Sequence, residues 1–273
     1  MSGVSYALTD SVTMLRRNMR HLMRYPIMII AYVGQPVFIL LVVVGIFGHA
    51  LGHGLGVQST DGHRYIDYVA PAMILITINY GLTTTALNVS NDMTAGIMDR
   101  FRTMAIARSS ILIGHVLEAV VRTLFSIALV LGLAVALKFR PDATPVEWIA
   151  AIGLMALLTL AFTWLVMAFA LATRSLEGAN SLTLPLQFLP FLSSAFVPAS
   201  TMPAGVDWFA RNQPLTPIIN TLRGLLMGSR IGNDGIVAVA WCVGIALVGY
   251  LWSKASFNRN STAPVAAAPA GKK

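Results

Sequence analysis

Charged residues are scarce in this sequence. Asp, Glu, Lys and Arg together make up 11% of its 273 residues, whereas hydrophobic residues make up 56%. Soluble globular domains carry about 25% charged residues, so this composition excludes an ordinary soluble domain. It predicts an integral membrane protein instead.

Several chemical motifs are also missing. The sequence has no GxxxxGK[ST] phosphate-binding loop, so we do not expect the chain to hydrolyse ATP itself. It has no GxSxG or HExxH motif and no visible pairing of a nucleophile with a base, which leaves an intramembrane enzyme without its chemistry. The single cysteine, Cys242, lies in an apolar run, so no disulfide can form within the chain.

Acidic residues are fewer than basic ones, 11 against 19, which gives a formal net charge of +8. Nucleic-acid binding would require the basic residues to cluster on one soluble surface. They lie beside apolar runs instead, which points to anionic lipid headgroups and to membrane orientation. We therefore expect membrane lipids as partners and no nucleic acid.

Apolar runs long enough to cross a bilayer recur along the chain, because about 20 helical residues span the hydrocarbon core. We predict an all-α membrane protein whose transmembrane domain, residues 27–255, has six spans, at about 27–48, 66–89, 111–137, 148–173, 180–197 and 236–253. An amphipathic interfacial helix is expected over 1–26, and a disordered tail over 256–273. Most Lys and Arg residues flank the spans on the side of the two termini, so that side is predicted to be cytoplasmic.

The region before the last span is apolar but broken by prolines. Pro198, Pro203 and Pro214 interrupt it, and it carries charges that include Arg223. Such a stretch is expected to dip into the outer leaflet as a re-entrant helical hairpin over 197–227. The alternative is a surface loop with an amphipathic helix.

The longest polar segment between two apolar runs is 91–110, NDMTAGIMDRFRTMAIARSS. Phe101 and Met104 belong to the apolar side of a predicted helix, and Asp99, Arg100, Arg102 and Arg108 supply charge on the other side. A short amphipathic helix of this kind can be a solvated loop helix, lie flat on the bilayer, or be gripped by a partner protein. We call residues 91–110 the connector.

Within the connector, GIMDRFRTMAIARS at residues 96–109 resembles the coupling-loop signature of type-2 ABC exporter permeases, particularly those similar to daunorubicin-resistance drug exporters. A second similar segment runs from Phe196-Val197-Pro198 to Met202-Pro203, followed by Asn212-Gln213-Pro214 and Leu222-Arg223-Gly224. Ala105 departs from the family, which often has proline there, and Thr94 stands where a charged residue is common.

The resemblance implies an elbow helix before the first span and an outer hairpin that caps a lateral exit route. It also implies a separate ATPase subunit that binds ATP and Mg, and either two copies of this permease or this chain with a paralogue, in a bacterial plasma membrane. The residues implied in ATPase coupling are Gly96, Asp99, Arg100, Phe101, Arg102, Met104 and Arg108.

Polar residues also occur inside the predicted spans. Glu118 and Arg122 are one helical turn apart, and an i,i+4 ion pair is the economical arrangement for charges in an apolar core. The pair either neutralises itself near the interface or lies on a substrate path or a moving helix contact. Asn79 and the Thr83-Thr84-Thr85 run need partners in a neighbouring helix or a wet cavity. A small-residue ladder at Ala128, Gly132 and Ala136 predicts close helix packing.

His49, His53 and His63 lie in a glycine-rich loop, but no carboxylate stands at a standard ligand spacing, so no metal site is predicted. Taken together, these features predict the permease subunit of an ATP-driven exporter of hydrophobic or amphipathic substrates such as drugs, lipids or glycolipids. The alternative is an ion- or proton-coupled secondary transporter, or a channel, that uses Glu118 as a proton relay. No residue pattern names the substrate.

Overall fold

The computed structural model describes residues 26–47, 65–94, 108–173 and 175–261. Within these ranges every regular element is helical, as predicted. The helices are α2 (Pro26–Val42), η1 (Val43–Phe47), α4 (Tyr65–Thr94), α6 (Arg108–Ala136), α7 (Pro145–Thr173), α8 (Leu176–Phe188), η2 (Leu189–Leu192), η3 (Ala199–Thr201), α9 (Ala204–Asn212), α10 (Leu215–Met227) and α11 (Asp234–Ser261).

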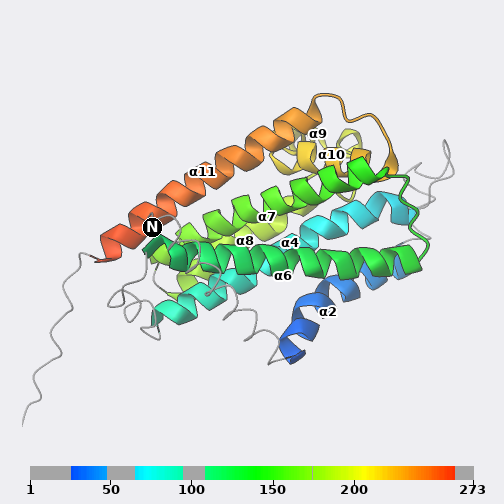
Figure 1. Ribbon diagram of the computed structural model, residues 1–273. Coiled ribbons are helices and arrows are strands. Elements are labelled where there is room, and N and C mark those ends of the chain that lie inside the picture. The colour runs from blue at the N-terminus through cyan, green and yellow to red at the C-terminus, as the bar shows by residue number, and fades with distance from the viewer. Residues whose placement is uncertain (1–25, 48–64, 95–107, 174, 262–273) are drawn as a thin grey trace, which may run out of the picture.

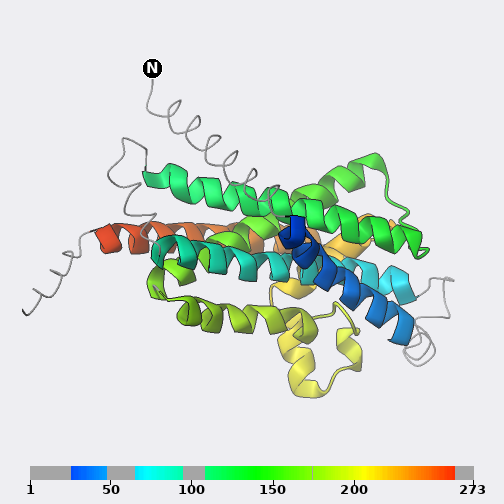
Figure 2. The same cartoon turned by 90° about the horizontal axis from the view of Figure 1, so that it is seen from below.

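The long helices run side by side between two ends of the molecule (Figure 1). At one end α4 stops and α6 starts, on either side of the connector, and we call this the connector end. At the other end α9 and α10 gather beside the turn between α6 and α7, and we call this the hairpin end. Helix α2 crosses the bundle at an angle and packs on α4 and α6 (Figure 2).

Four of the described helices are long and apolar enough to cross a membrane. These stretches are Ile66–Asn91, Leu112–Ala136, Pro145–Thr173 and Asp234–Phe257. They match the predicted second, third, fourth and sixth spans to within a few residues. The chain therefore has the helices of an integral membrane protein.

The other two predicted spans differ in how well the helices match them. The first, 27–48, matches a helical stretch from Pro26 to Phe47, formed by α2 and η1, which contains the apolar stretch Val33–Ile46. The fifth, 180–197, is helical only as far as Leu192, because α8 has 13 residues, continues as the 3-10 helix η2 and then gives way to turns. Pro190 in η2 has no backbone N–H to continue the α-helical bonding. The count of six spans stays a prediction.

Helix α4 forms the centre of the bundle, and α11 forms an edge. Met73, Ile74 and Ile78 of α4 are among the most fully buried side chains, and α4 packs on α2, α6, α7, α8 and α10. Helix α11 packs mainly on α7 and exposes large apolar side chains such as Ile236 and Leu251 along its outer side. This arrangement suits α4 to carry internal polar contacts and α11 to face lipid.

Small residues bring α7 and α11 close together. A Cβ added at Gly249 would lie 2.7 Å from the backbone nitrogen of Leu165. One turn further on, the Ser253 hydroxyl donates a hydrogen bond to the Trp164 carbonyl oxygen at 3.1 Å. The rings of Trp164 and Tyr250 meet edge to face, with centroids 5.1 Å apart. Close approach of this kind is how membrane helices pack without a hydrophobic driving force.

The small-residue ladder predicted on α6 does not pack within the chain. Ala128, Gly132 and Ala136 are exposed, and a Cβ added at Gly132 would meet nothing within 4 Å. The prediction of close packing there is wrong for this chain alone, because that side of α6 faces outward.

Two short helices, α9 and α10, occupy the region of the predicted outer hairpin. Helix α10 is largely buried, whereas α9 exposes most of its residues. Gly228 ends α10 in the left-handed conformation, with φ 64°, which glycine adopts without strain. The predicted depth of the hairpin in the outer leaflet stays a prediction.

Helix α11 runs to Ser261, so the predicted tail over 256–273 is wrong in its first residues, which are helical. Four further predictions fall wholly or almost wholly outside the described residues. They concern the tail beyond Ser261, the interfacial helix over 1–26, the loop with His49, His53 and His63, and the connector helix from Gly96 to Met104.

Candidate functional site: a polar seam between α4 and α6

The predicted ion pair is present on α6. The Nη1 atom of Arg122 lies 3.0 Å from Oε1 of Glu118, and the two side chains are only 4% and 7% exposed. Arg122 is the central residue of α6, equally far from Arg108 and Ala136. The pair therefore lies near the middle of α6 and not at its end, and its distance from a membrane interface stays a prediction.

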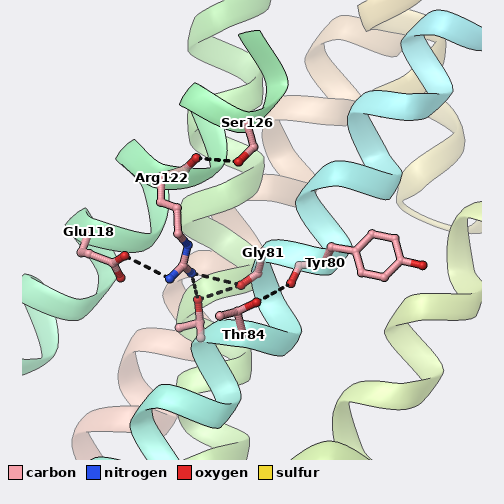
Figure 3. Close-up of polar contacts among 7 residues, drawn as sticks. Tyr80, Gly81, Thr84, Glu118, Arg122 and Ser126 are labelled. Carbon is pink, nitrogen blue, oxygen red and sulfur yellow. Dashed lines mark hydrogen bonds and ion pairs between the residues drawn. The ribbon is translucent and has the colours of Figure 1, made fainter. Parts of the chain in front are cut away.

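Arg122 also binds the neighbouring helix. Its Nη2 atom donates to the Thr85 hydroxyl oxygen at 2.9 Å and to the Gly81 carbonyl oxygen at 3.3 Å, both on α4 (Figure 3). The Thr85 hydroxyl donates in turn to the same Gly81 carbonyl at 2.9 Å. We call Gly81, Thr85, Glu118 and Arg122 the polar seam. A guanidinium shared between a carboxylate and a second helix joins α6 to α4 where water cannot compete.

Gly81 lets the two helices come this close. A Cβ added there would lie 2.5 Å from the hydroxyl oxygen of Thr123 on α6, a distance at which one of the two must move. On the other side of Arg122, the Ser126 hydroxyl donates to the Arg122 carbonyl oxygen at 3.1 Å. Sequence reasoning found the pair but missed Gly81, because only the fold shows which glycine meets α6.

The other predicted polar residues of α4 find partners elsewhere. The Thr83 hydroxyl donates to the Asn79 carbonyl oxygen at 3.3 Å and accepts a hydrogen bond from Gln187 of α8 at 2.9 Å. The Thr84 hydroxyl donates to the Tyr80 carbonyl oxygen at 3.1 Å. Asn79 itself is buried, two residues before the seam. The polar run of α4 thus forms hydrogen bonds with two neighbouring helices, through Thr85 with α6 and through Thr83 with α8.

The residues predicted in the outer hairpin form a separate group. Pro198, Pro203 and Pro214 each stand immediately before a helix, at the N-cap positions of η3, α9 and α10. Arg223 projects from α10 and places its guanidinium carbon 3.9 Å from the centroid of the Tyr68 ring on α4. The sequence analysis named Arg223 as one of the charges of this region and as part of the family motif, but gave it no partner.

In the sequence, the predicted coupling residues lie between the α4 residues and the α6 residues of the polar seam. Of these, Gly96, Asp99, Arg100, Phe101, Arg102 and Met104 fall outside the described residues, and Arg108 is the first residue of α6. The connector nevertheless joins the two helices that the polar seam links. As for metals, the described part of the chain gathers no three His, Cys, Asp or Glu side chains that could hold an ion.

The described residues form only helices as regular elements, four of these helices are long enough to cross a membrane, and α6 carries a buried ion pair whose arginine also bonds to α4. These features define an integral membrane protein. Its family is the ABC-2 type transporters, whose family model matches residues 9–227. The chain belongs to that family. The matched region includes the connector, the seam and the hairpin.

Curated relatives resemble the chain over most of its length. It is 25% identical over 224 residues to the probable doxorubicin resistance ABC transporter permease DrrC of Mycobacterium tuberculosis, covering 82% of this chain and 78% of that protein. It is 24% identical over 243 residues to the daunorubicin resistance ABC transporter permease DrrB1 of Streptomyces coeruleorubidus, covering 89% of this chain and 83% of that protein.

Proposed function

We propose that this chain is the membrane-spanning permease subunit of an ATP-driven exporter that moves a hydrophobic or amphipathic substrate out of the cytoplasm or inner leaflet. The observation that carries the proposal is the family match over residues 9–227. The two relatives are named for resistance to doxorubicin and daunorubicin, which makes a drug one candidate substrate. A lipid or a glycolipid has the same amphipathic character and is the other.

The energy would come from a separate ATPase subunit that holds ATP and Mg. The membrane unit would contain a second copy of this chain or a paralogue. In this proposal the chain crosses a bacterial plasma membrane six times, with both termini and the connector in the cytoplasm. The excess of basic residues beside the spans on that side supports the orientation.

In this proposal the polar seam transmits a displacement of the connector to the membrane helices α4 and α6. Helices α4 and α6 leave the two ends of the connector, and Arg122 ties them together through Thr85 and Gly81. A displacement that an ATPase imposes on the connector would then move α4 and α6 together and not bend one against the other. Glu118 holds the Arg122 guanidinium in place for this contact.

The side of the bundle formed by α4 and α8 is the one we assign to the substrate and the second subunit. Tyr80, Thr83 and Thr84 of α4 are partly exposed there, and Gln187 of α8 is bonded to Thr83. By contrast, the outer side of α11 exposes large apolar side chains. Polar groups at membrane depth are expected to face a cavity or another protein, whereas a uniformly apolar surface suits lipid.

The rival function is a proton-coupled transporter that uses Glu118 as its proton relay. In the structure its carboxylate is buried and bonded to Arg122 at 3.0 Å. A proton relay would need that bond to break in each cycle. Removing one partner of a buried pair costs about 3–5 kcal/mol, which makes Glu118 a poor carrier as long as Arg122 stays beside it.

Copurification decides between the two functions. The tagged chain is expressed with the proteins encoded beside it, extracted in mild detergent and assayed for bound ATPase. An associated ATPase that drives export from reconstituted vesicles supports the exporter. Transport by the chain alone that follows an imposed pH gradient, and is lost in Glu118→Gln, would establish the rival.

A further inference from the structure

The chain loses its helical hydrogen bonding between η2 and η3, in the interior of the hairpin end. Ser193, Ser194 and Ala195 are turn residues, and all three are buried, with 0%, 6% and 0% exposure. Backbone carbonyls at such a break have no partner within their own helix. In a membrane protein they must find donors from other elements, because no bulk water reaches them. We call residues 192–195 the break.

Side chains far away in the sequence supply these donors. Nη2 of Arg223 donates to the carbonyl oxygens of Ser194 and Ala195, each at 3.2 Å. Nε2 of Gln213 donates to the Leu192 carbonyl oxygen at 2.7 Å. The Tyr68 hydroxyl of α4 donates to the Ser194 carbonyl oxygen at 3.0 Å, beneath the Arg223 guanidinium. We call Tyr68, Gln213 and Arg223 the clamp.

Ser194 connects the break to two further helices. Its hydroxyl donates to the side-chain oxygen of Asn220 on α10 at 3.1 Å, and the Asn220 amide donates to Asp234 at the start of α11 at 2.9 Å. The Ser194 backbone nitrogen lies 3.4 Å from the Thr216 hydroxyl oxygen. Through this one residue the break is bonded to α4, α10 and α11, so the position of the outer hairpin depends on it.

Two atoms of the clamp have no hydrogen-bond partner within the described chain. They are Nε of Arg223 and Oε1 of Gln213, and both are buried. A buried polar atom without a partner raises the free energy of the arrangement that contains it. The two residues that hold the break are therefore incompletely satisfied in this conformation.

We infer that Gln213 and Arg223 are positioning residues of the transport cycle. Together with Tyr68 they hold the break closed against α4, and transport requires their release so that the hairpin end can open. The release rests on the proposed exporter function, whereas the closed clamp does not. Arg223 suits the task because a planar guanidinium can serve two adjacent carbonyls and lie on an aromatic ring at once.

Thiol labelling tests the inference. Cys242 is first replaced by alanine, and Ser193→Cys then places a thiol of nearly the same size in the break, where the native side chain is 0% exposed. Trp208→Cys on α9, at a side chain that is 69% exposed, serves as the control for reagent access. Both proteins are labelled in nanodiscs, where both membrane faces are open to the reagent.

At rest, the thiol at position 193 is expected to react slowly, and Arg223→Gln or Gln213→Leu should speed the reaction at least about tenfold by opening the break locally. The thiol at position 208 should react at one rate in all backgrounds. The labelling rate of position 193 in Arg223→Lys should fall between those of the unchanged Arg223 and Arg223→Gln. The lysine ammonium keeps the positive charge but lacks the planar set of donors of a guanidinium. Equal slow labelling in Arg223→Gln would overturn the clamp.

The release is tested in the complex with the ATPase. Hydrolysing conditions should speed labelling of position 193 in the otherwise unchanged protein and have no further effect in Arg223→Gln, a signature that a merely structural arginine would not give. Labelling that ignores ATP in the unchanged protein would overturn the release. Failure to find any ATPase would instead refute the proposed function, and the labelling at rest would still decide the clamp.

Discussion

Gly249 of α11 lies so close to α7 that a Cβ added to it would be 2.7 Å from the Leu165 backbone nitrogen and 2.8 Å from the Trp164 carbonyl carbon. Both atoms belong to the backbone, so they cannot move aside as the end of a flexible side chain can. The contact between the two helices therefore admits glycine and nothing larger without a shift of one helix.

Gly249→Ala is expected to push α11 away from α7 and to lower stability by about 1–3 kcal/mol, the usual cost of overpacking. The measurement is thermal unfolding of the purified protein in detergent. Gly244→Ala is the matched control, because it lies on the same helix with nothing within 4 Å of the added Cβ. Equal melting temperatures for the two variants would contradict the close contact.

Glu118→Gln should harm folding or transport more than the double change Glu118→Gln with Arg122→Gln. The single change leaves Arg122 charged and without its carboxylate in the membrane, at a cost of about 3–5 kcal/mol, whereas the double change removes both charges. Expression level, unfolding and export are compared for the three proteins. A double mutant that folds normally but transports no better than Glu118→Gln would show that the pair does more than neutralise itself.

Gly81→Ala should separate α4 from α6, because the new methyl group would lie 2.5 Å from the Thr123 hydroxyl oxygen. Thr123→Ala removes that oxygen, so the double mutant should recover much of the lost stability, a coupling of about 0.5–3 kcal/mol. The measurement is a double-mutant cycle in thermal unfolding. Additive effects would mean that the clash is relieved in another way. Gly153→Ala, where the added Cβ meets nothing within 4 Å, controls for glycine loss in a helix.

Asp207 and Arg211 of α9 form an exposed ion pair at 2.6 Å, which the proposed topology places outside the cell. With Cys242 replaced, Asp207→Cys and Arg211→Cys should react with an impermeant thiol reagent applied to intact cells. Glu177→Cys, exposed in the first turn of α8 at the connector end, should react only after the cells are opened. Labelling of position 207 only from the cytoplasm would overturn the topology.

Phe101→Ala tests the proposed contact between the connector and an ATPase. An aromatic anchor at an interface typically costs about 2 kcal/mol or more when truncated, so binding of the ATPase should weaken and export should fall while the permease reaches normal levels. Arg102→Lys should also weaken binding if a planar guanidinium docks on a carboxylate, and should be harmless if the connector only touches lipid headgroups. Pull-down of the ATPase gives the comparison. Equal recovery with all variants and unchanged export would refute the coupling role.

The sequence predicted those features that depend on neighbouring residues. The four long helices followed from uninterrupted apolar runs, and the Glu118–Arg122 pair followed from a spacing of one helical turn. The partners of Arg122 on α4 did not follow, because Gly81 and Thr85 are about forty positions away and any small or polar residue of that helix was equally eligible.

Two errors have a common physical origin. The ladder at Ala128, Gly132 and Ala136 looks the same in sequence whether it meets a helix or faces outward, and here it faces outward. The stretch 180–197 is apolar enough for a span, but its hydrogen bonding stops near Leu192, and Gln213 and Arg223 supply the missing donors. Hydropathy predicts neither fact. The first depends on whether another helix packs against the ladder, and the second depends on hydrogen-bond donors from a distant segment.

Arg122 stands at the middle of α6, and Gly81 lies close to the middle of α4. Because α4 and α6 are joined near their midpoints, a tilt of α6 would pivot about this contact. At a rise of about 1.5 Å per residue each arm of α6 is roughly 21 Å long, so a tilt of about 5° would carry each end about 2 Å, in opposite directions. A displacement at the connector end would thus reappear in the opposite direction at the hairpin end of the helix.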